Sequence, residues 1–234
     1  MTLLNDRYVP ITSGLGFLEA PLGEVAQALE QWRVAIHGSA RQERFLGGFE
    51  DNVLKLEPLV SGWTSRELLV ATSNPNWTAF FDCDVLGGDQ KTPISYLAKT
   101  MGCHGLFVCS VPASKDASRG PWGGIQYKLY GPVGTPSNYV RAISLSQDGA
   151  RWSFDADDKP VLDFEEVEAY TSRKVRDRFT LDMLKRYCAA LGLHPFDAEF
   201  YPGPSILVTN ASELQTQETS LTLAEVRERM GLSN

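Results

Sequence analysis

The chain has 234 residues, of which 43% are hydrophobic, and its formal net charge at pH 7 is −7. A chain of this length buries roughly 70% of the surface that its unfolded form would expose, so a substantial core is expected. The negative charge disfavours binding to nucleic acid and to anionic membrane surfaces. The N-terminus has no basic start before an apolar run, and no later stretch approaches the ~18 apolar residues of a membrane span. A cytoplasmic protein is therefore expected.

The four cysteines lie in apolar or amphipathic segments, as is typical of buried free thiols in a reducing compartment. They are Cys83, Cys103, Cys109 and Cys188. Cys103 is followed by His104, but no second pair of this kind stands at the spacing of a zinc finger. The pattern therefore predicts no zinc site.

The segment from Asp155 to Glu166 shows part of the pattern of a calcium-binding loop. Asp155, Asp157 and Glu166 stand at positions 1, 3 and 12 of that loop. Lys159 and Pro160 stand at positions 5 and 6, where a ligand oxygen and a glycine are required. We therefore expect no calcium and no other cofactor, and we interpret the segment as an acidic hairpin.

In the first half of the chain, the apolar spacing predicts one helix over 22–36 that ends at Gly38 and another over 92–101 that ends at Gly102. Strands are predicted over 54–57, 67–72, 77–82 and 106–111. The strand, helix and strand between Trp77 and Val111 are a candidate parallel crossover, with the strand direction left open.

In the second half, alternating residues predict an antiparallel meander that turns at Asp148-Gly149. Its strands are expected over 125–130, 139–146, 151–155 and 161–164. A helix follows Thr180, a short strand covers 206–208, and Thr222 with Glu225 forms the capping box of a last helix. Together these elements predict a single α+β domain over 1–234, with a mixed, mainly antiparallel sheet and about four helices.

The sequence carries no recognisable catalytic motif. It has no phosphate-binding loop and no nucleophile elbow, and its histidines are His37, His104 and His194. No serine or cysteine is visibly partnered with any of the three. A hydrolase-like enzyme whose site is assembled from distant residues therefore stays open as an alternative.

The charge pattern is the strongest candidate for a binding surface. A run of carboxylates precedes the basic residues Arg173, Lys174, Arg176 and Arg178. The acidic candidates are Asp155, Asp157, Asp158, Glu165, Glu166 and Glu168, with Asp163 among them. Either the two runs are solvated and partly neutralise one another, or the acidic run recruits a basic protein partner.

Two tryptophans are candidate aromatic anchors for such a partner. Trp152 lies in the predicted hairpin beside the acidic run, and Trp122 lies in the segment 112–124, which is predicted to be a loop. Trp122 could equally fold back over the edge of the sheet, and Trp152 could belong to the core.

The segment from Asp148 to Tyr187 also carries a resemblance. It contains Arg151-Trp152, Phe164-Glu165 and the run from Arg176 to Thr180. It resembles a family of uncharacterised bacterial cytosolic proteins and is similar in style to immunity proteins, which neutralise the toxins of competing cells. The acidity, the missing catalytic motifs and the abundant aromatic side chains predict a non-enzymatic protein-binding protein, and the resemblance points to a basic toxin as its partner. An assembly or structural subunit is the other alternative.

Overall fold

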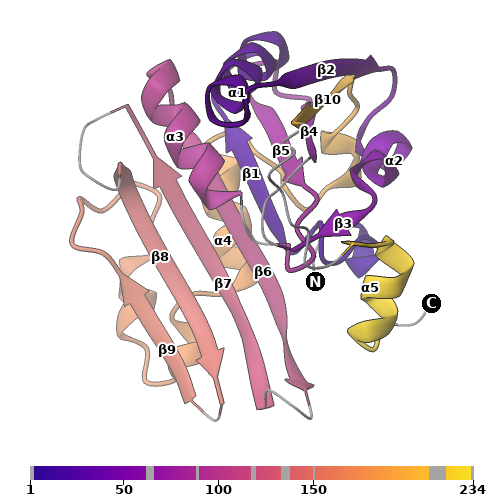
Figure 1. Cartoon of the computed structure of the whole chain (residues 1–234). Helices are drawn as coiled ribbons and strands as arrows, with labels where there is room; N and C mark the ends of the chain where they lie inside the picture. Colours follow the sequence, from indigo (N-terminus) through magenta and orange to yellow (C-terminus); the bar gives the residue numbers. More distant parts are fainter. Residues whose placement is uncertain are drawn as a thin grey trace.

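The computed structural model describes residues 3–61, 66–87, 90–116, 120–132, 138–149, 151–210 and 220–232. The main sheet consists of β1 (Gly14–Leu18), β2 (Ala40–Phe45), β4 (Arg66–Ala71), β5 (Thr78–Asp82), β6 (Gly105–Asp116), β7 (Gly120–Tyr130), β8 (Tyr139–Asp148), β9 (Arg151–Ala156) and β10 (Ser205–Asn210). These nine strands lie in the order β2-β10-β4-β5-β1-β6-β7-β8-β9 (Figure 1). Every pairing within this sheet is antiparallel, which confirms the α+β prediction.

One face of the sheet is covered by α1 (Leu22–His37) and α3 (Lys91–Met101) (Figure 1). α3 approaches the strands closely because two glycines face it. A Cβ at Gly16 or at Gly105 would lie 2.8 Å from a carbon of Ile94, which is closer than side chains can pack. The helices leave β9 uncovered on this face, where Arg151, Ser153 and Asp155 are exposed.

The opposite face carries the larger core, against which α4 (Leu181–Ala190) packs. Thr180 caps this helix by accepting a hydrogen bond from the amide of Met183 at 3.3 Å, as its sequence predicts. Tyr127 on β7 and Tyr187 on α4 meet edge to face, with ring centroids 6.1 Å apart. The segment between β9 and α4 forms two 3-10 turns, η3 (Val167–Thr171) and η4 (Val175–Asp177).

Smaller elements complete the fold at one end of the sheet. They are α2 (Phe49–Asn52), the 3-10 turn η2 (Val53–Leu56), β3 (Leu59–Val60), β11 (Ser220–Leu221) and α5 (Leu223–Arg229). β3 pairs with β11, and α5 begins at the predicted capping box of Thr222 and Glu225. None of the helices in the described ranges is long and apolar enough to cross a membrane.

Several local predictions were wrong. Where a strand was expected over 54–57, residues 53–56 form a 3-10 turn, and residues 161–164 do not continue the meander. The candidate parallel crossover is present, because β5 and β6 run in the same direction on either side of α3 in the chain, with β1 between them in the sheet and paired with both. The predicted loop 112–124 belongs mostly to β6 and β7, which pair up to Asp116 and Gly120.

Candidate functional site

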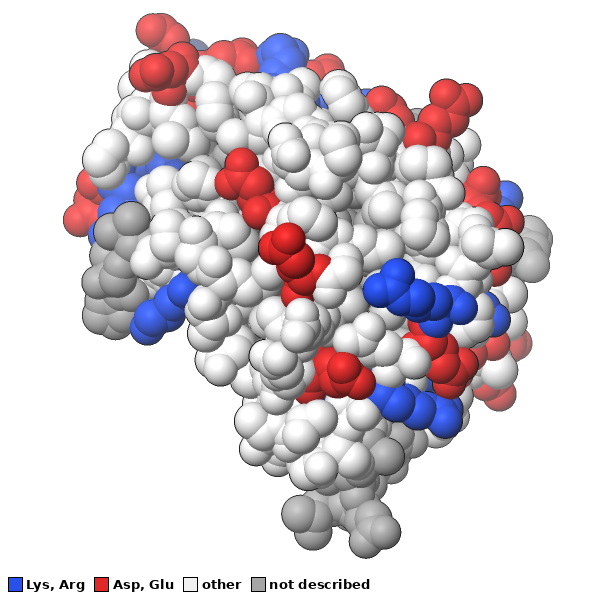
Figure 2. Space-filling model, turned by 90° about the horizontal axis from the view of Figure 1, so that it is seen from above, with Lys and Arg blue, Asp and Glu red and all other residues white. Residues whose placement is uncertain are grey.

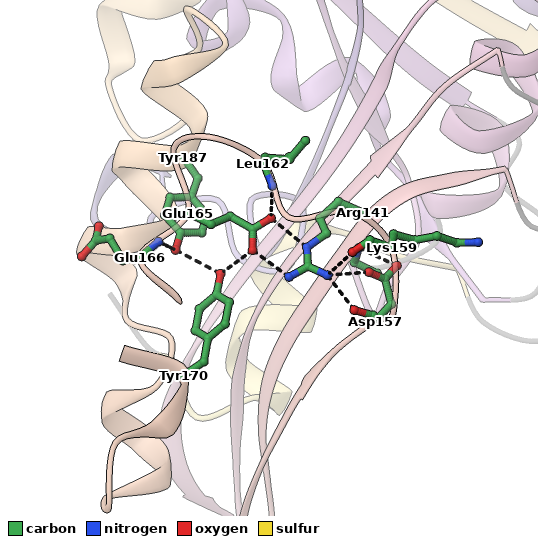
Figure 3. Close-up of polar contacts among 9 residues, drawn as sticks. Arg141, Asp157, Lys159, Leu162, Glu165, Glu166, Tyr170 and Tyr187 are labelled. Atoms are coloured by element: carbon green, nitrogen blue, oxygen red, sulfur yellow. Dashed lines mark hydrogen bonds and ion pairs between the residues drawn. The ribbon is translucent and has the colours of Figure 1, made fainter. Parts of the chain in front are cut away.

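The chain that follows β9 is organised around Arg141, a residue of β8 whose side chain is 3% exposed (Figure 3). A guanidinium group removed from water needs acceptors for its N–H groups, because an unpaired buried charge is very costly. Burial alone would lower the pKa of Arg141, but hydrogen bonds and the charges of Glu165 and Asp157 outweigh burial and raise it. Arg141 is therefore a fixed cation.

Glu165 supplies the bidentate partner of this cation. Its two carboxylate oxygens accept from Nε and Nη2 of Arg141 at 2.8 and 2.7 Å. The same carboxylate also accepts from the amide of Leu162 and from the hydroxyl of Tyr170, each at 2.9 Å. Its side chain is fully buried, and these four hydrogen bonds replace the water that it lost.

Asp157 and the backbone after it occupy the other side of the guanidinium group. Nη1 of Arg141 donates to the carbonyl of Asp157 at 2.6 Å, to its carboxylate at 2.9 Å and to the carbonyl of Lys159 at 3.2 Å. The second carboxylate oxygen accepts from the amide of Ala142 at 2.9 Å. Arg141 thus fixes the chain on both sides of the turn that leaves the sheet.

A chain of hydroxyl groups links this cluster to α4 (Figure 3). The hydroxyl oxygens of Tyr170 and Tyr187 lie 3.0 Å apart, and that of Tyr187 accepts from the amide of Glu166 at 2.7 Å. Burial raises the pKa of both tyrosines, and for Tyr170 the hydrogen bonds to Tyr187 and Glu165 raise it further. Both hydroxyls therefore stay protonated at neutral pH.

Three carboxylates of the predicted acidic surface thus form ion pairs with arginines of the same chain. Asp157 and Glu165 bind Arg141, and Glu166 accepts from Arg186 of α4 at 2.7 and 2.9 Å. The remaining ones, Asp155, Asp158, Asp163 and Glu168, are exposed. In the described part of the chain these four form no ion pair, and the pairs that the acidic run does form are with Arg141 and Arg186, not with the basic residues 173–178. Recruitment of a basic partner stays a prediction.

The structure describes the side chain of one of the two aromatic candidates. Trp152 is half-buried and packs, with Phe154, against the core on the covered face of β9. The backbone of Trp122 pairs with Asp148 in the β7–β8 ladder, but its side chain lies outside the described residues. Trp152 therefore contributes to packing, and the role of either tryptophan as an anchor stays a prediction.

A second polar site lies beside the residues that follow β1 and those that precede β5 and β6. Nδ1 of His104 lies 2.6 Å from a carboxylate oxygen of Glu19, and both side chains are about half exposed. They line a hollow of 430 Å³ together with Asn76, Cys103 and neighbouring backbone. Burial, with the charge of Glu19, raises the pKa of the Cys103 thiol to about 11, so this thiol is a poor nucleophile at neutral pH.

The other two histidines do not line the hollow beside His104. His37 closes α1, and burial together with the charge of Arg33 lowers its pKa. Nδ1 of His194 lies 4.0 Å from a carboxylate oxygen of Asp197, and both side chains are exposed. Among the residues that the structure describes, no group of three His, Cys, Asp or Glu side chains could hold a metal ion.

Comparison with known proteins identifies no relative of this chain. No protein-family model, no curated protein and no solved structure matches the chain. The resemblance of the segment after Asp148 to immunity proteins therefore stays a prediction. On the face in Figure 2, basic and acidic side chains are interspersed among wide uncharged areas, so the net negative charge does not gather into one patch there.

Sequence reasoning missed Arg141, although the signal was present. In the strand 139–146, Arg141 shares its alternation with Ile143 and Leu145, which are both core residues. A charged residue at a core-facing position needs a buried partner of opposite charge. The acidic run that follows the hairpin was the nearest source of such a partner.

Proposed function

We propose that this protein binds another protein without catalysing a reaction, and that it does so through Asp158, Asp163 and Glu168, here called the acidic segment. The observation that supports this proposal is that these exposed carboxylates have no ion-pair partner among the described residues. They lie on a stretch that Arg141 and Glu165 hold in place. A fixed set of free carboxylates steers a basic partner and loses little entropy on binding.

The partner that fits this surface is a basic protein. The net charge of −7 adds a long-range attraction for such a partner. The resemblance to immunity proteins points in the same direction, since an inhibitor of a basic toxin needs affinity and no catalytic group. Arg173 and Lys174, exposed just beyond the acidic segment, would orient the partner by repelling its basic side.

The test is the association rate of a basic partner obtained from a neighbouring toxin gene. A variant with Asp158→Asn, Asp163→Asn and Glu168→Gln should associate more slowly and with a weaker dependence on salt. The matched control, Glu24→Gln, Glu199→Gln and Glu228→Gln, removes the same charge from exposed sites elsewhere. Equal rates for the two triple variants would show that net charge, and not the acidic segment, governs binding.

A hydrolase is the second candidate, because the hollow beside His104 contains an imidazole oriented by a carboxylate. In that arrangement Glu19 accepts a hydrogen bond from the N–H at Nδ1, and Nε2 is left to accept a proton from a bound water. His104→Gln should then abolish hydrolysis of an ester substrate, while His194→Gln should not. Equal residual activity in both variants would reject the hydrolase.

A further inference from the structure

The strand β9 lies at one edge of the sheet and has a self-complementary sequence. In the described part of the chain it pairs in register with β8 alone, so its outer backbone groups have no strand partner. Its residues alternate between an open face, with Arg151, Ser153 and Asp155 exposed, and a covered face, with Trp152 and Phe154 half-buried. An unpaired edge of this kind is a template for another strand.

Two copies of β9 can pair antiparallel about a two-fold axis at Ser153. The axis is perpendicular to the sheet, so paired residues must lie on the same face, and the register places Arg151 opposite Asp155 of the second copy. By symmetry Asp155 lies opposite Arg151 of the second copy, and Trp152 lies opposite Phe154. Each open-face contact is then an ion pair, and each covered-face contact is aromatic, which are favourable cross-strand combinations.

We infer that the protein forms a two-fold symmetric homodimer in which two β9 strands join their sheets into one. The charge complementarity is available because Arg151 and Asp155 have no ion-pair partner among the residues described. The nearby turn η4 does not supply one either, and its Val175 packs on the core of the covered face. The dimer leaves the acidic segment outside the strand pairing, so it is independent of the proposed function.

The opposite edge of the sheet shows why β9 is the favoured edge. β2 also carries a pair of opposite charges, but its Arg41 and Glu43 already contact each other within the strand at 3.1 Å. Pairing across β2 would therefore exchange one exposed ion pair for another. Because Arg41 and Glu43 already pair with each other, β2 offers a second copy no unpaired charge from this pair, and Arg41 provides a matched control.

The test is the molar mass of the free protein as a function of concentration, measured by sedimentation velocity. A pair of short strands buries less than the ~1,000 Å² typical of a stable interface, so a concentration-dependent monomer–dimer equilibrium is expected. Arg151→Asp or Asp155→Arg places like charges opposite each other twice per dimer, which should raise the dissociation constant about tenfold or more. Arg41→Asp should leave it unchanged.

Mixing the two single variants gives the decisive result. The chain with Arg151→Asp has two acidic positions and the chain with Asp155→Arg has two basic ones, so together they should form a heterodimer although neither self-associates. The double variant Arg151→Asp/Asp155→Arg restores complementarity and should dimerise like the wild type. A wild-type protein that stays monomeric at about 1 mM would overturn the inference, as would single variants that still dimerise or a loss of dimer with Arg41→Asp.

Discussion

Glu165 holds Arg141 through two hydrogen bonds of 2.8 and 2.7 Å, and neither side chain is more than 3% exposed. Removing Arg141 leaves Glu165 as a buried, uncompensated charge, and removing Glu165 leaves Arg141 with only Asp157, whose side chain is 22% exposed. Arg141→Met and Glu165→Leu should therefore each lower the free energy of unfolding by about 3–5 kcal/mol. Urea denaturation of the two single variants measures this loss.

The double variant separates the pair from the packing around it. Arg141→Met/Glu165→Leu should lose much less stability than the sum of the single losses, because neither charge of the buried pair remains and Asp157, which then lacks Arg141, is 22% exposed. Arg186→Met is the matched control, since Arg186 also forms a bidentate pair with a carboxylate but is 57% exposed. Its loss should stay below about 1 kcal/mol. Equal losses for Arg141→Met and Arg186→Met would contradict a special role for the buried pair.

Alkaline pH should destabilise the fold through Tyr170 and Tyr187. Both have a pKa raised above the ordinary value of 10 in the folded state, for which burial is the first cause. Above pH 10 the unfolded chain therefore binds fewer protons than the folded one, so stability is complete below that pH and falls as the pH rises. Urea midpoints measured from about pH 8 to about pH 11, on both sides of the ordinary tyrosine pKa of ~10, test this loss of stability.

The variant Tyr170→Phe separates this effect from general alkaline unfolding. It removes one titrating hydroxyl and one hydrogen bond to Glu165, so the protein should be less stable at neutral pH. Its stability should also fall less steeply above pH 10 than that of the wild type. A variant with an unchanged slope would show that Tyr170 ionises as freely in the folded state as in the unfolded chain.

Much of the local structure could be predicted because it depends on neighbouring residues. The cap of Thr180, the stop at Gly102 and the turn at Gly149 each follow from backbone chemistry within a few positions. The strand β2 could not be found in this way. Its sequence is mostly polar, and it becomes a strand because β10, about 160 residues later in the chain, pairs with it.

The functional residues were predictable to a smaller extent for the same reason. The acidic run is visible in the sequence, but its division into buried and exposed carboxylates depends on where Arg141 lies. A second buried pair joins Arg33 of α1 to Glu67 of β4, and Arg33 follows Leu29 at helical spacing on the apolar face. In both cases the arginine on a core-facing position was the detectable signal, and the individual carboxylate that pairs with it was not.

The thiols should react slowly in the folded protein. All four cysteines are free, and burial raises the pKa of both Cys103 and Cys109 to about 11. The thiolate is the reactive form, so alkylation by iodoacetamide at pH 7.5 should be far slower than for a free cysteine with a pKa of ~8.5. Mass spectrometry should find four modified thiols after denaturation and few before it. A native disulfide or one rapidly labelled thiol would contradict this prediction.

The capping box of α5 is expected to stabilise the packed C-terminal helix. The hydroxyl of Thr222 accepts from the amide of Glu225 at 3.2 Å, and the carboxylate of Glu225 accepts from the amide of Thr222 at 2.7 Å. Leu223 and Val226 of the same helix are buried. Thr222→Ala should therefore cost about 1 kcal/mol, measured as a shift of the urea midpoint at neutral pH.

The pH dependence of this cap has a definite sign. Hydrogen bonds from the backbone and the side chain of Thr222 lower the pKa of Glu225 below its ordinary value of 4.5. The stabilisation is thus present above pH 4.5 and is lost as the pH falls through the lower pKa of the folded state, and Glu225→Gln should remove this acid-sensitive part. Thr100→Ala is the control, because its hydroxyl donates to carbonyls near the end of α3 and caps no amide. If Thr222→Ala shifts the midpoint no more than Thr100→Ala does, α5 does not depend on its cap for its place on the fold.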